Sequence, residues 1–502
     1  MARIAFTSGF YTSQSPNADC EVAVNWYPEQ IESGVGQSAM ALYPTPGLGL
    51  YATLPGMLSV PTCFHFAGRR FFIGQDLYNQ YLFEVVNTQF VTNFGKLGVA
   101  NGPSSFAANN ANQLMVCSSG LLFLFQLNIN TLTQIDTTSG TVVIGPVAQI
   151  SFSDGFFIAL IANSQTIQVS SLLNGSATGW SPLNFTIVSV FPDQVLSMLV
   201  DHREVWFWGS KQTIPYFDAG APIFPYLPVP GGFIEQGIIA PQSPVKLDNS
   251  VMWIGGDERG AGVAWRANGY LPTRISTHAI ENQWQNYPTM ADAIGYSFQY
   301  LGHSCAHWYF PTANKSWRYD VATGLWHEPA SGIGGLQAHL SACHMFDGVQ
   351  HLVGDRASGN IYIMSNAYLT DNGKPIQRIR RGPPVSSEQE FMFLNQFQLY
   401  IESGLGPQPP LTDTEGNPRG PEFYFRMSKD GGHTWTDPVV MDGGQAGEFA
   451  RRLLVRRMGR ARSVIFEVST TDPFPARIVD AYLDAPGMEK QRRLPLKLAQ
   501  MQ

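Results

Sequence analysis

The chain has 502 residues and a formal net charge of −7, and only 14% of its residues are charged, whereas ordinary soluble domains carry about 25%. It holds instead 49 Gly, 34 Pro and 12% aromatic residues, a composition typical of loop-rich β proteins whose surface is partly covered in an assembly. The net negative charge argues against a protein that grips nucleic acid over its whole surface, although it is compatible with a channel that encloses DNA loosely.

The first residues, 1–6, lack the apolar core and cleavage site of a secretory signal. No window approaches the roughly 18 consecutive apolar residues of a membrane span. The cysteines are scattered and form no CxxC pair: Cys20, Cys63, Cys117, Cys305 and Cys343. We therefore expect reduced thiols in a protein that is assembled in the cytoplasm and does not insert into membranes.

From residue 56 to 370, short apolar runs alternate with Gly, Asn, Asp and Pro turns, with almost no helical periodicity. Units of similar layout recur about every 40 to 50 residues, the period of propeller blades built from four short strands. They cover 62–84, 105–135, 148–169, 195–217, 245–275, 303–327 and 338–364. The spacing predicts an all-β fold with a six- or seven-bladed β-propeller over 56–370, and 1–55 as an N-terminal arm and the start of propeller closure. Two unrelated β-sandwiches are the alternative.

Inside this region, the apolar loop 223–232 contains Phe224 and Tyr226. A long apolar loop is typical of segments that are covered by a partner, so we expect it to be buried in an interface or to enter the lumen.

The unit 303–327 contains two notable patterns. Trp317 to Trp326 resembles the Tyr-Asp…Thr-Gly…Trp stretch of kelch-type blades, in which Asp and Gly build a turn and Trp packs between adjacent sheets. His303-x-Cys305-x-His307 places three potential metal ligands on one face of a strand. The aromatic residues that follow favour ordinary buried core residues over a metal site.

The composition changes at 371–384, which is basic and turn-rich and marks a domain boundary. Beyond it, strand-like runs at 391–402, 422–428, 463–469 and 476–483 predict a smaller antiparallel β-sandwich over 385–485. The last residues, 486–502, are polar and basic, and we expect an extended tail that orders on a partner.

The sandwich region contains one match to the Asp-box pattern Ser-x-Asp-x-Gly-x-Thr-Trp. It consists of Ser428, Asp430, Gly432, Thr434 and Trp435. Such a box is a structural turn, in which Gly supplies positive φ and Asp caps backbone amides. We expect a turn here and not an active site.

Six arginines cluster within twelve residues: Arg451, Arg452, Arg456, Arg457, Arg460 and Arg462. They flank a strand-like run, 453–455, and crowd a turn at Gly459. Arginines in this arrangement suit contacts with a neighbouring subunit or with DNA phosphates, or they form a solvated turn.

No Walker loop, Rossmann fingerprint, HExxH or Gly-x-Ser-x-Gly motif is present. Asp201-His202 lies near Ser197 only along the chain, and a triad is defined by geometry. A propeller glycosidase would need paired acidic residues at one cleft, and a carbohydrate-binding module would expose aromatic residues such as Tyr216 and Phe217. We expect no enzymatic activity, no metal and no cofactor.

Several segments resemble, in the same order, the head-to-tail hub or packaged-DNA stabilisation proteins of short-tailed bacteriophages, also called tail accessory proteins. They are 17–19, 24–29, 43–48, 205–217, 236–240, 251–255, 428–435 and 456–462. Pro215 stands where that family often has Glu, so no role of that carboxylate is carried over.

The resemblance implies a β-propeller in each subunit of a ring, generally a hexamer, in the virion tail. It implies contacts with portal or adaptor proteins and with tail spikes, fibres or a needle. It also implies a role in retaining packaged double-stranded DNA, without sequence specificity, and in forming part of the ejection channel.

Overall fold

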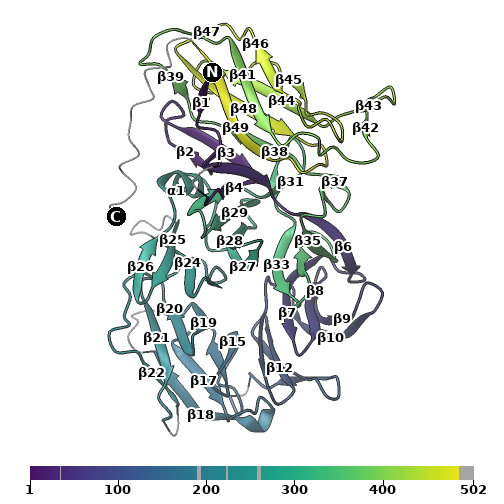
Figure 1. Ribbon diagram of the computed structural model, residues 1–502. Coiled ribbons are helices and arrows are strands. Elements are labelled where there is room, and N and C mark those ends of the chain that lie inside the picture. Colours follow the sequence, from purple (N-terminus) through teal and green to yellow (C-terminus); the bar gives the residue numbers. More distant parts are fainter. Residues whose placement is uncertain (34–35, 139, 189–193, 222–223, 257–261, 486–502) are drawn as a thin grey trace.

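A computed structural model describes residues 1–33, 36–138, 140–188, 194–221, 224–256 and 262–485 of the protein. It has two bodies, a wheel of small sheets and a sandwich of two larger sheets packed beside the rim of the wheel (Figure 1). Helix is limited, in this part of the chain, to α1 (His278–Trp284) and a single 3₁₀ turn at Ala177–Gly179. None of the helices described is long and apolar enough to cross a membrane.

The wheel is a β-propeller of seven blades within the described residues: six are four-stranded antiparallel sheets, and the seventh is part of a six-stranded sheet. In the first six blades the strands follow each other along the chain, and the blades run from β7 (Ser59–Phe66) to β10 (Val91–Val99), β11 (Ser105–Asn109) to β14 (Thr131–Ile135), β15 (Val147–Ser153) to β18 (Trp180–Ile187), β19 (Ser197–Asp201) to β22 (Tyr226–Pro228), β23 (Val245–Leu247) to β26 (Leu271–Arg274), and β27 (Ile294–Tyr300) to β30 (Leu325–His327). Each predicted unit overlaps one blade, and the fold class expected from the sequence is confirmed.

The turn between the first two strands of a blade explains why the blades have the same arrangement of strands although their sequences are dissimilar. In five blades two consecutive residues there have positive φ, which is the geometry of a type I′ hairpin. The pairs are Ala67-Gly68, Asp154-Gly155, His202-Arg203, Asp248-Asn249 and Leu301-Gly302. The backbone path is the same while the side chains differ.

The seventh blade closes the wheel with a strand from the N-terminal region. Its strands β33 (Ser341–Phe346), β34 (His351–Asp355) and β35 (Asn360–Ser365) are completed by β6 (Gly47–Thr53), which pairs antiparallel with β35. Because the last blade takes its outer strand from residues that precede the first blade, the two ends of the wheel are joined by backbone hydrogen bonds.

The kelch-like stretch forms the predicted turn and inter-sheet contact. Asp320 accepts a hydrogen bond from the Ala322 amide at 3.0 Å, and Gly324 has φ +68°. The Trp326 side chain is 1% exposed, and its indole N–H donates to the Ile275 carbonyl at the end of the preceding blade. The tryptophan therefore packs between adjacent blades.

The sandwich combines both ends of the described chain. One sheet has the order β4-β5-β49-β41-β46 with β1 beside β49, and the other has the order β2-β3-β38-β48-β44-β45 with β39 beside β48. The N-terminal strands are β1 (Ala2–Ile4), β2 (Tyr11–Thr12), β3 (Cys20–Val24), β4 (Trp26–Gln30) and β5 (Met40–Pro44), and the C-terminal ones are β38 (Arg378–Arg381), β39 (Val385–Ser386), β41 (Gln396–Ile401), β44 (Glu422–Ser428), β45 (Val439–Asp442), β46 (Leu453–Arg456), β48 (Ser463–Thr470) and β49 (Ile478–Asp484). Phe397, Phe425 and Phe466 pack together in the core between the sheets.

The basic segment that the sequence predicts to be a boundary turn contains a central strand of this sandwich. Arg380 on β38 is fully buried, and its guanidinium donates to the carbonyls of Phe6 and Gly9 and to the Glu21 carboxylate. The local sequence does not reveal this burial, because the N-terminal carbonyls and the carboxylate that satisfy the buried cation lie 359 to 374 residues away along the chain. The predicted tail, 486–502, lies outside the described residues.

Candidate interaction surface

The far end of the sandwich presents two adjacent edge strands, β45 and β46. Each stands at the end of its sheet among the described strands, and the two lie next to each other across the sandwich (Figure 1). On β46, Leu453 and Val455 point into the core, while Arg456 is exposed. On β45, Val439 and Val440 are 45% and 53% exposed, so apolar side chains also face outward at this edge.

The six predicted arginines all lie exposed along this edge. Arg451 forms an ion pair with Asp442 on β45. The guanidinium groups of Arg452 and Arg456 donate to the neutral side-chain amides of Gln398, at 2.7 Å, and Gln396, at 3.1 Å. Arg457, at φ +59°, and Gly459, at φ +79°, form the predicted turn after β46.

Arg460 and Arg462 stack on one aromatic ring. Their guanidinium carbons lie 4.9 and 4.7 Å from the centroid of Phe391. Phe391 is nevertheless 49% exposed, and Phe393 and Phe449 are 59% and 73% exposed. Exposed aromatic residues beside arginines are typical of the anchor residues of protein interfaces. These phenylalanines were not predicted as surface contacts. Their only sign in the sequence is a large apolar residue within a polar segment.

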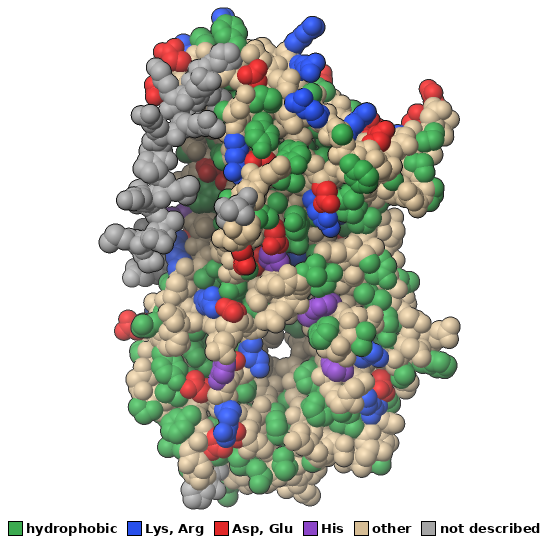
Figure 2. Space-filling view, viewed as in Figure 1, with side chains coloured by type: hydrophobic (Ala, Val, Ile, Leu, Met, Phe, Trp, Pro, Cys, Tyr) green, Lys and Arg blue, Asp and Glu red, His purple; other side chains and the backbone are tan. Residues whose placement is uncertain are grey.

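We call this surface the basic edge: Val439, Val440, Phe449, Arg451, Arg452, Arg456, Arg457, Arg460, Arg462, Phe391 and Phe393. Among the residues that the structure describes, only Arg451 of its six arginines has a carboxylate partner. The edge therefore carries unneutralised positive charge in a chain of net charge −7, and basic side chains stand out at this end of the molecule (Figure 2). Such a surface attracts carboxylates or phosphates and buries apolar area on contact.

The Asp-box lies beside this region and forms a closed turn. Asp430 accepts hydrogen bonds from the Thr434 hydroxyl at 2.5 Å, the Thr434 amide at 2.9 Å and the Ser428 hydroxyl at 2.7 Å, and these bonds, chiefly the first, hold its pKa well below the usual range. Ser428 accepts from the Gly432 amide, and the Trp435 indole donates to the Gly432 carbonyl. The box supplies local rigidity, since its polar groups bind one another.

Trp435 joins the box to the sheet. Its ring lies between the guanidinium groups of Arg381 and Arg426, at 4.7 and 4.8 Å. Both arginines also pair with Glu467 on β48.

Phe224 and Tyr226 do not lie on a free surface. Tyr226 is 2% exposed, donates to the Ser153 carbonyl at 2.8 Å, and packs in the core between the third and fourth blades. Phe224 is partly buried against the same core. The expectation that Tyr226 is a contact with a partner or with the lumen is wrong, because a cavity between two blades of its own chain takes up the ring. Ile223, which was included in the predicted loop, lies outside the described residues.

The His303–His307 strand lies at the junction between the sixth blade and the N-terminal strands. The ring of His303 contacts Asp320 at 2.7 Å through Nδ1 and Glu29 of β4 at 2.6 Å through Nε2, and its pKa is raised to about 9, chiefly by the bond to Asp320. His307 is fully buried against Tyr296, and burial lowers its pKa. In the described chain, no group of three His, Cys, Asp or Glu residues is arranged to hold a metal ion.

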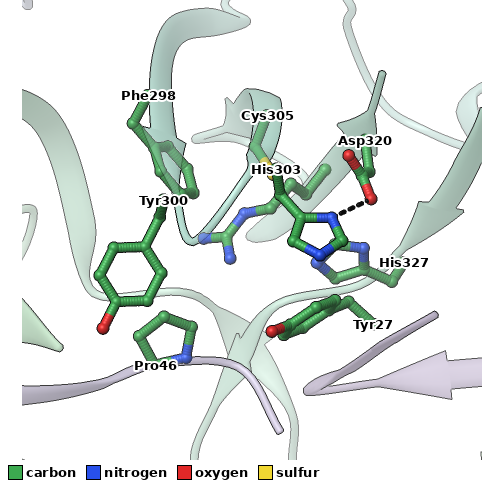
Figure 3. Close-up of a pocket in the computed structure, with 9 residues that line it drawn as sticks. Tyr27, Pro46, Phe298, Tyr300, His303, Cys305, Asp320 and His327 are labelled. Atoms are coloured by element: carbon green, nitrogen blue, oxygen red, sulfur yellow. Dashed lines mark hydrogen bonds and ion pairs between the residues drawn. The ribbon is translucent and has the colours of Figure 1, made fainter. Parts of the chain in front are cut away.

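A cavity of about 20 Å³ lies next to His303, lined by Tyr27, Pro46, Phe298, Tyr300, His303, Cys305, Arg318, Asp320 and His327 (Figure 3). This is the volume that one or two water molecules need. The buried Arg318 Nε and both nitrogens of His327 lack protein partners in the described residues, so ordered water suits the site better than a substrate.

The Asp201-His202 pair lies in a polar groove of about 340 Å³ at the first-strand turns of blades four to six. The His202 ring contacts Asp201 and Asn249, whereas the buried Ser197 donates to the Pro241 carbonyl. Both nitrogens of His202 are thus engaged with groups other than Ser197, and these residues form no triad.

Comparisons with known proteins address both bodies of the molecule. The family model described as bacteriophage P22 Gp10, beta-propeller, matches residues 2–368, and the one described as bacteriophage P22 Gp10, beta-sandwich, matches residues 377–485. No curated protein matches the sequence.

Solved structures match only distantly. YCF48 from Cyanidioschyzon merolae is 10% identical, with a TM-score of 0.41 over 64% of this chain and 99% of its own. A streptogramin B lyase is 10% identical, with a TM-score of 0.41 over 68% and 97% of the two chains. Likeness at this level carries no information about function. The family models, in contrast, account for both domains in order, and the chain belongs to the bacteriophage P22 Gp10 family, the tail accessory proteins of short-tailed bacteriophages.

Proposed function

We propose that the protein is a non-catalytic structural subunit of a bacteriophage tail hub or nozzle. In this proposal copies of the chain form a ring, generally a hexamer, below the portal and adaptor. The ring retains packaged double-stranded DNA, forms part of the ejection channel and anchors spikes, fibres or a needle. The observation that carries the proposal is that the two Gp10 family models together cover nearly the whole described chain.

The surface chemistry supports an assembly role. The basic edge leaves arginines and phenylalanines exposed in an otherwise well-packed protein, as expected of a surface that is covered by a partner. Asp201 and Asp248 line the same groove, but each carboxylate is already paired, with His202 and with Arg266, whereas a glycosidase needs two acidic groups available to the substrate.

Native mass spectrometry with negative-stain imaging tests the proposal. The purified chain is measured alone and after mixing with the portal and adaptor proteins of the same virion. We expect a ring in one of the two samples, and a phage that lacks the chain should lose packaged DNA. A monomer that joins neither protein, from a gene whose loss leaves virions full of DNA, would contradict the proposal.

A further inference from the structure

The outer strand of the third blade is an unprotected β-edge. Strand β18 pairs only with β17 (Thr166–Ser170) in its blade, and Leu183, Phe185 and Ile187 on it are 75%, 40% and 51% exposed. Proteins usually protect such an edge with charges, because an open apolar strand invites pairing with another chain. Here the sequence from Gly155 to Pro192 contains no charged residue.

The neighbouring fourth blade also exposes apolar side chains. Phe217 on β21 (Thr213–Asp218) and Leu227 on β22 are cross-strand partners and are 37% and 48% exposed. We call these residues of the two blades the apolar rim: Leu183, Phe185, Ile187, Phe217 and Leu227. Exposed apolar side chains that gather on outer strands are typical of interaction sites.

Charge indicates which partner fits the rim. Residues 147–243, which form the third and fourth blades, contain six acidic and two basic residues, whereas the propeller as a whole has only a modest excess of acid. Asp218 follows Phe217 on β21 and is partly exposed, and Glu235 is exposed. The apolar rim therefore has acidic residues near its apolar side chains. The basic edge also exposes apolar side chains, and most of its arginines lack a carboxylate partner.

The two surfaces lie at opposite ends of the molecule. Strands β18 and β22 are at the end of the propeller remote from the sandwich, and β45 to β47 (Arg460–Ala461) are at the far end of the sandwich (Figure 1). One copy cannot bring its own edge to its own rim. When the edge of one copy contacts the rim of another, the pair still has one free rim and one free edge. Further copies can therefore add in the same way until a ring closes.

We infer that the basic edge of one copy docks on the apolar rim of the next. This head-to-tail contact rests on the proposed ring and specifies its subunit interface. The apolar side chains of both surfaces are buried together, while arginines of the edge meet the acidic residues that flank the rim.

Two variants of the full chain test the contact. The edge variant carries Arg456→Glu and Arg460→Glu, and the rim variant carries Leu183→Lys and Ile187→Lys. Their matched controls are Lys374→Glu, at an exposed position of the propeller, and Leu271→Lys, which replaces a leucine that is 72% exposed on the outer strand of the fifth blade. Thermal unfolding followed by circular dichroism verifies that every variant folds.

Native mass spectrometry then measures assembly at equal concentration. We expect each variant alone to lose oligomers at least tenfold, the controls to behave as the wild type, and an equimolar mixture of the two variants to form heterodimers. The mixture recovers association because the rim of the edge variant and the edge of the rim variant are intact.

Two results would overturn the inference. If the variants assemble like the wild type, the ring can still exist, but its subunits make contact through other surfaces. A variant that still dimerises alone, together with a mixture that forms no heterodimer, would indicate that like surfaces pair. The proposed function fails separately, if the wild type joins no ring even with portal and adaptor.

Discussion

Arg380 connects the N-terminal strands to the rest of the sandwich through its guanidinium group. The group is fully buried and donates to Phe6, Gly9 and Val22 carbonyls as well as to Glu21. Replacing it by leucine leaves a carboxylate and three carbonyls without their donor. We expect Arg380→Leu to lower the free energy of unfolding by about 3–5 kcal/mol, measured by urea denaturation. Arg452→Leu, at an exposed position, should change it by less than about 1 kcal/mol, and equal effects would contradict this role.

His303 couples the sixth blade to β4 through Asp320 and Glu29, and its raised pKa makes the coupling depend on pH. A group whose pKa is raised to about 9 on folding stabilises the protein fully below its unfolded value of 6.5, and this contribution is lost as the pH rises through about 9. We expect His303→Gln to lower the free energy of unfolding by about 2 kcal/mol near pH 6 and by least above pH 9. Melting temperatures measured across this pH range check the trend. His278→Gln, whose side chain is 82% exposed, is the control. A difference that does not depend on pH would argue against an ionised His303.

At the level of strands, the closure between the seventh and first blades requires a very close approach. A Cβ added at Gly354 on β34 would lie 2.4 Å from the Val60 carbonyl oxygen of β7 and 2.9 Å from the Cys343 sulfur. We expect Gly354→Ala to destabilise the protein by about 1–3 kcal/mol, measured by thermal unfolding. Gly335→Ala has open space around the added carbon and should be nearly neutral. If both alanines behave alike, the blades are not in contact at Gly354.

The elements also indicate what sequence can and cannot predict. The strands beside the tight turns are predictable, because turns and apolar runs are local, and 105–135 coincides with the blade from β11 to β14, although the unit 303–327 misses β27, the first strand of the sixth blade. Outer strands such as β10 and β18 were missed, since one side of them faces solvent and their apolar pattern is weak. The burial of Arg378, Arg380 and Tyr226 within this chain was not predicted from the sequence, because it depends on residues far away along the chain.

For the whole molecule, the propeller is inserted into the sandwich, since β1 to β5 precede it and β38 to β49 follow it. We expect residues 377–485 expressed alone to be unfolded by circular dichroism and NMR, because both sheets lose strands and Arg380 loses its acceptors. Adding a peptide of residues 1–45 should restore dispersed amide signals. A folded 377–485 fragment without the peptide would show that the N-terminal strands are dispensable.

The same insertion sets an order for biosynthesis. Phe6 and Arg380, which hydrogen-bond in the sandwich, are 374 residues apart, and at about 5–20 residues per second a ribosome needs roughly 20–75 s to cover that distance. The first strands must wait for their partners throughout this time, while the propeller is made and closed. The arginine-bearing edge exists only on a chain translated through its sandwich. If the proposed head-to-tail contact forms, prematurely terminated chains lack one of its two surfaces, and they are kept out of the ring without a separate inspection step.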